Sequence, residues 1–121
     1  MMTREQLLMV GGVKTSEVEI EGVGTVRLRE MSGQDRDEYF GLLCRASRIS
    51  HEGKEVPDIF AAGAKPFLVA RCVVDSADQP VFAGPADAGK NLRPECLDAI
   101  FDAINEINAL SDKEQKETEK N

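Results

Sequence analysis

One heptapeptide in this chain has the spacing of a nucleotide-binding loop. Residues 84–90, GPADAGK, match the pattern G-x-x-x-x-G-K, in which backbone N–H groups and a lysine bind phosphate. The surroundings argue against that chemistry, because Asn91 stands where a serine or threonine would hold magnesium and Asp87 brings a negative charge. Pro85 lacks an amide donor, and Pro94 interrupts the helix that should follow. We therefore predict that the match is accidental and that the chain uses no cofactor.

Two further groups of side chains have types suited to acid–base or nucleophilic chemistry. Asp35, Asp37 and Glu38 lie close together, but on a helix only Asp35 and Glu38 share a face. We expect these carboxylates to form the solvated first turns of a helix. His51 and Cys44 could act as base and nucleophile, yet no third residue is in view to orient the histidine. The sequence therefore predicts no catalytic residues, and the protein is expected not to be an enzyme.

The three cysteines are the remaining reactive residues. Cys44, Cys72 and Cys96 are odd in number and form no C-x-x-C pair, so we expect them to be buried free thiols. The chain has a single histidine, which leaves too few ligands for a Cys/His zinc site. No metal site is predicted.

Length and charge restrict the class of protein. A chain of 121 residues is long enough for one modest domain and too short for two independent cores. The net charge of −7 disfavours direct binding of nucleic acid. No apolar run approaches the roughly 20 residues that span a bilayer, and the N-terminal run is too short for a signal peptide. We expect a cytosolic protein that binds neither nucleic acid nor membrane.

Helix and strand signals divide the N-terminal half. Thr3 and Gln6 have the spacing of a capping box, which predicts a short helix ending at the glycines 11–12. Apolar and polar residues alternate through residues 16–31, with glycines between two runs, which predicts a β-hairpin. Ser32 should cap a second helix, whose apolar stripe is Tyr39, Leu42, Leu43 and Ala46. Residues 47–57 are polar and are expected to form a surface loop.

The C-terminal half contains the strongest apolar segments. Residues 58–74 are rich in apolar side chains, and the best helix within them is predicted at residues 66–74. A turn is expected at residues 75–80, a short third strand at residues 81–82, and then a loop at residues 84–85.

The last helix is the clearest amphipathic element. It should begin at Pro94, and its apolar side chains recur every three or four residues as Leu97, Ile100, Phe101, Ile104, Ile107 and Leu110. Such a stripe is more often core than partner site. Residues 1–110 are thus predicted to form a single α+β domain, an N-terminal β-hairpin packed with about four helices. Residues 111–121 contain no apolar anchor and should form a charged, flexible tail.

Several segments resemble one family when they are taken in order. The runs KTSEVEI (residues 14–20) and GTVRLREMSGQDRDEY (residues 24–39) resemble the opening of tail assembly chaperones from long-tailed bacteriophages and prophages. In that family a strand pair carrying a V-R-x-L-S/T-x-x-E/D-R phrase leads into a helix. The resemblance continues in LVARCVVD (residues 68–75), residues 81–82, LDAIF (residues 97–101) and INALS (residues 107–111).

The resemblance implies a function as well as a fold. It implies a protein that binds the aggregation-prone tape-measure protein in the cytoplasm of the bacterial host cell, helps recruit tail-tube subunits, and is absent from the mature virion. Many such proteins also occur as a longer, frameshifted form whose extension contacts the tail-tube protein. Self-association is compatible with this role.

The sequence also suggests a contact surface and leaves alternatives open. As a hypothesis, exposed parts of Leu97, Phe101, Ile104 and Ile107 bind the partner, with the strand pair as scaffold. The main alternative is a minor tail or head–tail connector protein that remains in the particle. A small regulatory module that binds a host protein is a further alternative.

Overall fold

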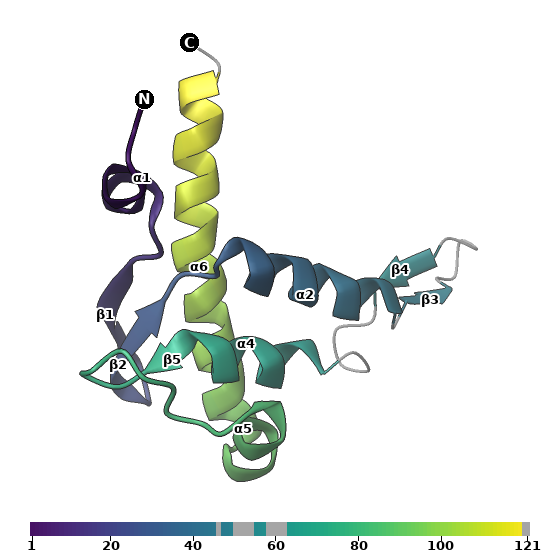
Figure 1. Cartoon of the computed structure of the whole chain (residues 1–121). Coiled ribbons are helices and arrows are strands. Elements are labelled where there is room, and N and C mark those ends of the chain that lie inside the picture. The colour runs from purple at the N-terminus through teal and green to yellow at the C-terminus, as the bar shows by residue number, and fades with distance from the viewer. Residues whose placement is uncertain (46, 50–54, 58–62, 120–121) are drawn as a thin grey trace.

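A computed structural model of the protein describes residues 1–45, 47–49, 55–57 and 63–119. The helices, labelled in Figure 1, are α1 (Arg4–Gly11), α2 (Gly33–Arg45), α4 (Ala64–Cys72), α5 (Pro85–Asn91) and α6 (Pro94–Glu119). The strands are β1 (Thr15–Ile20), β2 (Gly24–Arg29), β3 (Ser47–Ile49), β4 (Glu55–Pro57) and β5 (Val73–Val74). Over the described residues these elements form one small α+β domain with five helices, which confirms the predicted fold class.

The predicted N-terminal hairpin is confirmed in β1 and β2. The strands pair antiparallel and place Glu17 opposite Arg27, so opposite charges face each other across the pair. Gly22 in the connection has a φ of +82°, in the left-handed region that glycine adopts without steric strain. Ile20 and Leu28 are buried in the core, so the alternation of side chains in the sequence does mark the inner face of the hairpin.

Reciprocal capping hydrogen bonds mark the N-terminal ends of α1 and α2. The Thr3 hydroxyl accepts a hydrogen bond from the Gln6 amide, and the Gln6 side chain accepts one from the Thr3 amide, which confirms the capping box. At α2 the Ser32 hydroxyl accepts from the Asp35 amide at 3.1 Å, and the Asp35 carboxylate accepts from the Ser32 amide at 3.1 Å. The predicted cap at Ser32 is therefore confirmed.

The core forms between α6, α4 and the hairpin. α6 begins at Pro94 as predicted and packs against both α4 and β1, while α4 also contacts α2 and α5. In Figure 1, α6 runs behind α2 and α4. The fully buried apolar side chains include Leu28 of the hairpin, Leu68 and Val69 of α4, and Ile104 of α6. Burial from three separate segments is what joins them into one domain.

The third strand lies at a different place from the one predicted. Val73 and Val74, directly after α4, pair antiparallel with β2 and give the sheet order β1-β2-β5. The strand predicted at residues 81–82 is wrong. The chain turns back after β5, so that Val74 forms a single bridge with Pro80 and the Val81 amide donates to the Val73 carbonyl at 3.3 Å. Val73 and Val74 are both β-branched and favour an extended backbone. The prediction of a helix through residue 74 does not take this preference into account.

Three other predicted boundaries need correction. α4 spans Ala64–Cys72 instead of residues 66–74, because Pro66 fits within the first turn, where its missing N–H is not needed. The surface loop expected at residues 47–57 includes β3 and β4, which pair antiparallel. The loop expected at residues 84–85 is the start of α5, whose first residue is Pro85.

Some predictions fall on segments that the structure does not describe or test. Ala46 of the predicted α2 stripe, His51 and residues 58–62 lie outside the described residues. The helical backbone of α6 continues to Glu119, past the boundary predicted near residue 110. Flexibility of residues 111–121 stays a prediction.

The difference in burial between α4 and α1 predicts a difference in stability. Leu68→Ala should lower the free energy of unfolding by about 2–5 kcal/mol, because Leu68 is fully buried and its loss leaves a cavity. Leu7→Ala, the same substitution in α1, should change it by less than about 0.5 kcal/mol, because α1 has no buried residue. Urea denaturation followed by circular dichroism measures both, and equal losses would contradict the observed core.

Candidate partner-binding surface

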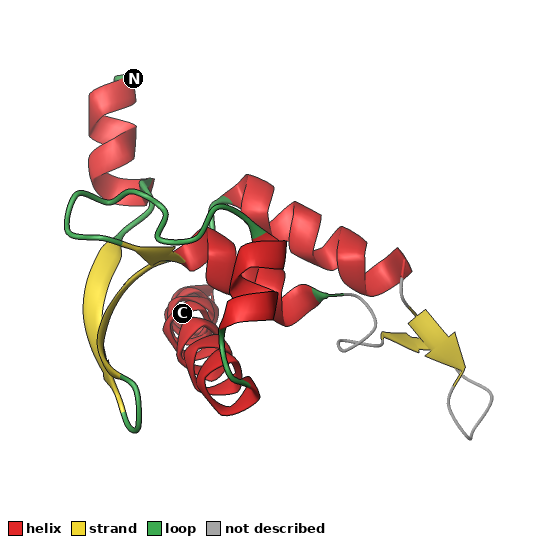
Figure 2. Cartoon of the chain, turned by 90° about the horizontal axis from the view of Figure 1, so that it is seen from below, coloured by secondary structure: helices red, strands yellow, loops and turns green. Residues whose placement is uncertain are grey.

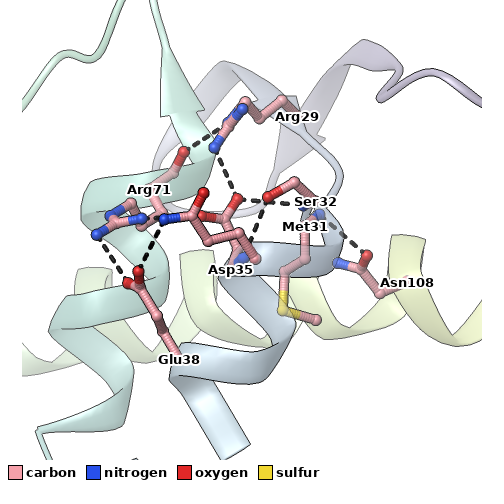
Figure 3. Close-up of polar contacts among 8 residues, drawn as sticks. Arg29, Met31, Ser32, Asp35, Glu38, Arg71 and Asn108 are labelled. Carbon is pink, nitrogen blue, oxygen red and sulfur yellow. Dashed lines mark hydrogen bonds and ion pairs between the residues drawn. The ribbon is translucent and has the colours of Figure 1, made fainter. Parts of the chain in front are cut away.

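A buried carboxylate holds the hairpin, α2 and α4 together. Asp35 is 2% exposed, and its two oxygens accept from Arg29 at 2.7 Å, from Arg71 at 2.9 Å and from the Ser32 amide at 3.1 Å. Figure 3 shows the guanidinium groups of Arg29 and Arg71 pointing toward this carboxylate from opposite sides. The expected solvated position of Asp35 is wrong, and its role is to join three elements.

The charges of this cluster balance. Arg71 also forms an ion pair with Glu38 at 2.9 Å, so two guanidinium groups face two carboxylates. Arg29 donates a further hydrogen bond to the Arg71 carbonyl at 2.8 Å, which ties β2 to the end of α4. A buried carboxylate that is paired and hydrogen-bonded in this way is a structural group.

A second contact fixes the segment before α2 to α6. The Met31 amide donates to the side-chain oxygen of Asn108 at 3.2 Å, and the Asn108 side-chain nitrogen donates to the Ile104 carbonyl at 2.7 Å. Figure 3 shows Asn108 reaching from α6 toward Met31. The chain between β2 and α2 is therefore held on α6 as well as by Asp35.

These contacts shape a groove with a volume of about 490 Å³. Its walls come from the chain after α1, the segment before α2, one face of α2 and two positions of α6. Val13, Met31, Tyr39 and Phe40 supply its apolar lining, and Asn105 and Asn108 its polar end. Phe40 is 52% exposed at the groove although it is a large aromatic residue. A groove with an apolar wall and a few polar groups is suited to a peptide or helix.

α1 is the most unusual element of the surface. None of its residues is buried, and Leu7, Leu8, Met9 and Val10 are 51–82% exposed. Figure 2 shows α1 standing clear of the other helices. Four consecutive residues of a helix point in four directions, so the second turn of α1 is apolar on every side, while its first turn is polar. A helix of this kind is expected to be covered on most sides when the protein is at work.

The link between α1 and the groove is short and sterically demanding. Gly11 and Gly12 line the groove and end the helix, with the Gly12 amide donating to the Leu8 carbonyl at 3.0 Å. A Cβ atom at Gly12 would collide with the Leu8 carbonyl oxygen. The exposed helix and the groove therefore adjoin each other at a position that requires glycine. Together they define the candidate surface, α1 with Val13 and Phe40.

The residues predicted from sequence to bind a partner lie mostly elsewhere. Phe101 and Ile104 are core residues of α6, at 5% and 0% exposure, so the exposure expected for them is wrong. Leu97 and Ile107 are half-buried and pack against the same core. The structure thus uses this stripe for the core, and what signalled the missed surface was the unbroken apolar run at residues 7–10.

The other residues considered for chemistry, Asp37 and residues 84–90, lie on different helices. Asp37 is exposed on α2. Residues 84–90 are the N-cap and most of α5, in which Asp87 accepts a hydrogen bond from the Ala83 amide at 2.9 Å. Within the described ranges no group of His, Cys, Asp and Glu is placed to hold a metal ion. In that same part of the chain no helix combines the length and apolar character needed to cross a membrane.

The three cysteines differ in exposure. Cys72 is buried, Cys96 is half-buried and Cys44 is exposed, so the expectation of three buried thiols is wrong for Cys44. Burial, and to a smaller extent the charge of Asp35, raises the pKa of the Cys72 thiol to about 12. All three thiols are free.

Replacing the central carboxylate should destabilise the fold. Asp35→Asn should lower the free energy of unfolding by about 2–3 kcal/mol, since it leaves two arginines without their shared partner. This loss of stability is at the low end of the range for buried ion pairs, because both arginine side chains remain partly exposed to water. Asp37→Asn, on the exposed side of the same helix, should have little effect. Equal losses in thermal unfolding would contradict a structural role for Asp35.

The thiols should react in a fixed order. At pH 8 an uncharged maleimide should modify Cys44 first, while Cys72 reacts only after unfolding, because thiolate is the nucleophile and the raised pKa keeps Cys72 protonated. Raising the pH to 9 should leave Cys72 unmodified in the folded protein, since its pKa is still higher. Mass spectrometry of peptides after timed labelling measures the order, and early labelling of Cys72 would contradict its burial.

Comparisons of the chain with protein-family models, with curated proteins and with solved structures find no match.

Proposed function

We propose that this chain is a tail assembly chaperone of a long-tailed bacteriophage or prophage, which binds the tape-measure protein in the cytoplasm of the bacterial host cell. It also helps to recruit tail-tube subunits, through a frameshifted longer form where one is made, and leaves before the virion is complete. The ordered resemblance of residues 14–20 and 24–39 to that family supports the proposal.

The observation that carries the proposal is the exposed apolar helix α1. A chaperone needs an apolar surface that the rest of its own fold does not use, and α1 exposes Leu7, Leu8, Met9 and Val10 without burying any residue of its own. A tape-measure protein exposes helical apolar stripes before the tube surrounds it. α1 and the adjoining groove present complementary apolar surface to such a stripe.

The size of the surface suits temporary binding. Covering a large apolar side chain contributes about 1.5–3 kcal/mol, and association itself costs roughly 4–15 kcal/mol. The four exposed side chains of α1 therefore support only modest affinity for each copy. Many copies along one long target can together give high occupancy and still be displaced one by one as the tube forms.

The charge of the chain suits the same role. With a net charge of −7, copies covering a target would make the complex strongly acidic and would oppose its aggregation. The contact surface differs from the one predicted at Leu97, Phe101, Ile104 and Ile107, because that stripe is half-buried or buried. α1, Val13 and Phe40 replace it in the proposal.

The proposal is tested by coexpression with the tape-measure protein of the same phage. The native chain should keep that protein soluble and copurify with it. Leu8→Lys combined with Val10→Lys should abolish both effects, because the two positions lie on nearly opposite faces of α1 and at least one lysine must enter the contact. The chaperone itself should stay folded, since neither side chain is buried.

A charge-matched variant controls for the two added lysines. Thr25→Lys combined with Val81→Lys places them at exposed positions away from α1 and should copurify like the native chain. Loss of binding in both variants would indicate a charge effect and contradict the assignment to α1. Presence of the chain in purified tails, with no effect on tape-measure solubility, would instead identify a minor tail or connector protein.

A further inference from the structure

We propose that two copies of this chain form a dimer in which α1 of each copy occupies the groove of the other. The dimer covers the surface that binds the target, so it is a resting form that the target opens. The dimer rests on the exposed area and charge of this surface, whereas its regulatory meaning rests on the proposed function.

The exposed apolar area matches what a stable dimer needs. The apolar side chains that α1, the two methionines before it and the groove leave exposed are Met1, Met2, Leu7, Leu8, Met9, Val10, Val13 and Phe40. At roughly 150–200 Å² for each fully exposed large side chain, they present on the order of 900 Å². A stable interface buries about 800 Å² on each partner, and ordinary monomers expose patches of about 300–600 Å².

The charge around this surface also favours a second copy. Arg4, Lys14 and Arg36 lie on or beside it, and so do the three acidic residues Glu5, Glu30 and Asp37. The surface is therefore nearly neutral, although the chain as a whole carries −7. Two like surfaces can meet only if they do not repel, and here the excess negative charge lies elsewhere.

The positions of helix and groove suit a symmetric pair. Both belong to one continuous surface, because Gly11 and Gly12 join α1 to the groove that they line. In a two-fold dimer the same patch occurs on both sides, so each α1 can enter the partner's groove in the same way. α1 stands clear of its own body in Figure 2, which leaves it accessible to a partner.

The dimer would also cover α1 more completely than contact with one flat stripe. Because residues 7–10 of α1 are apolar on every side, they gain most from a groove that encloses them. The groove offers Tyr39 and Phe40 on one wall and Met31 on another. A target that binds α1 must displace the partner copy, so the target and the second copy compete for α1.

Sedimentation equilibrium of the full chain without any target tests the dimer. The native chain should change from monomer to dimer with a dissociation constant in the micromolar range or tighter. Leu8→Lys with Val10→Lys should raise that constant about tenfold or more, and Thr25→Lys with Val81→Lys should leave it within about twofold. A native chain that stays monomeric up to several hundred micromolar would overturn the proposal.

Cross-linking tests the geometry separately. One chain carries Met9→Cys and the other Phe40→Cys, both with the exposed Cys44 replaced by serine. Mild oxidation of the mixture should give mainly a disulfide-linked pair of unlike chains, because position 9 of one copy lies in the groove of the other. Predominant linkage between two Met9→Cys chains would show α1 pairing with α1 and would overturn the assignment.

The two proposals fail in different ways. If the dimer forms as described but the tape-measure protein does not displace the second copy, the dimer interface is supported and the chaperone function is refuted. A monomer that binds the tape-measure protein through α1 would refute the dimer and keep the function.

Discussion

The carboxylate of Asp35 is the contact on which the arrangement of the elements depends. It receives hydrogen bonds from the end of β2 and the start of α2, which are close in the sequence, and from Arg71 near the end of α4, which is 36 residues away. Since a buried carboxylate is strongly unfavourable without such donors, arrangements that move the hairpin or α4 away from Asp35 are disfavoured. Met31 and Ser32, which form one wall of the groove, are held in place by the same network and by Asn108.

The domain separates the residues that hold it together from those that it leaves exposed. Burial is concentrated in the hairpin, α4 and α6, where Leu28, Leu68 and Ile104 are fully enclosed. α1 contributes nothing to this core, yet it has a capping box and a glycine stop that define it as a helix. Local signals thus favour α1, and the core does not cover it. The uncovered apolar residues 7–10 of this helix are the physical basis of the proposed binding and of the proposed dimer.

Much of the fold could be predicted because its signals are local. The alternation in residues 16–31, the caps at Thr3 and Ser32 and the start of α6 at Pro94 are properties of neighbouring residues. The burial of Asp35 could not be predicted, because it depends on Arg71 arriving from a distant helix. The surface was missed for a related reason: the regular stripe of α6 suggested a binding face, whereas packing made it core.

The detachment of α1 has a consequence for how such a chain can evolve. Substitutions in the core must preserve packing, and changes near Asp35 must preserve three hydrogen-bonded segments at once. Residues 7–10 are under no such restriction, because none of them is buried. Their sequence is free to follow that of whatever they contact, while the body stays constant. Gly12 is then the junction between a body whose substitutions are restricted by packing and a recognition element that is not restricted in this way.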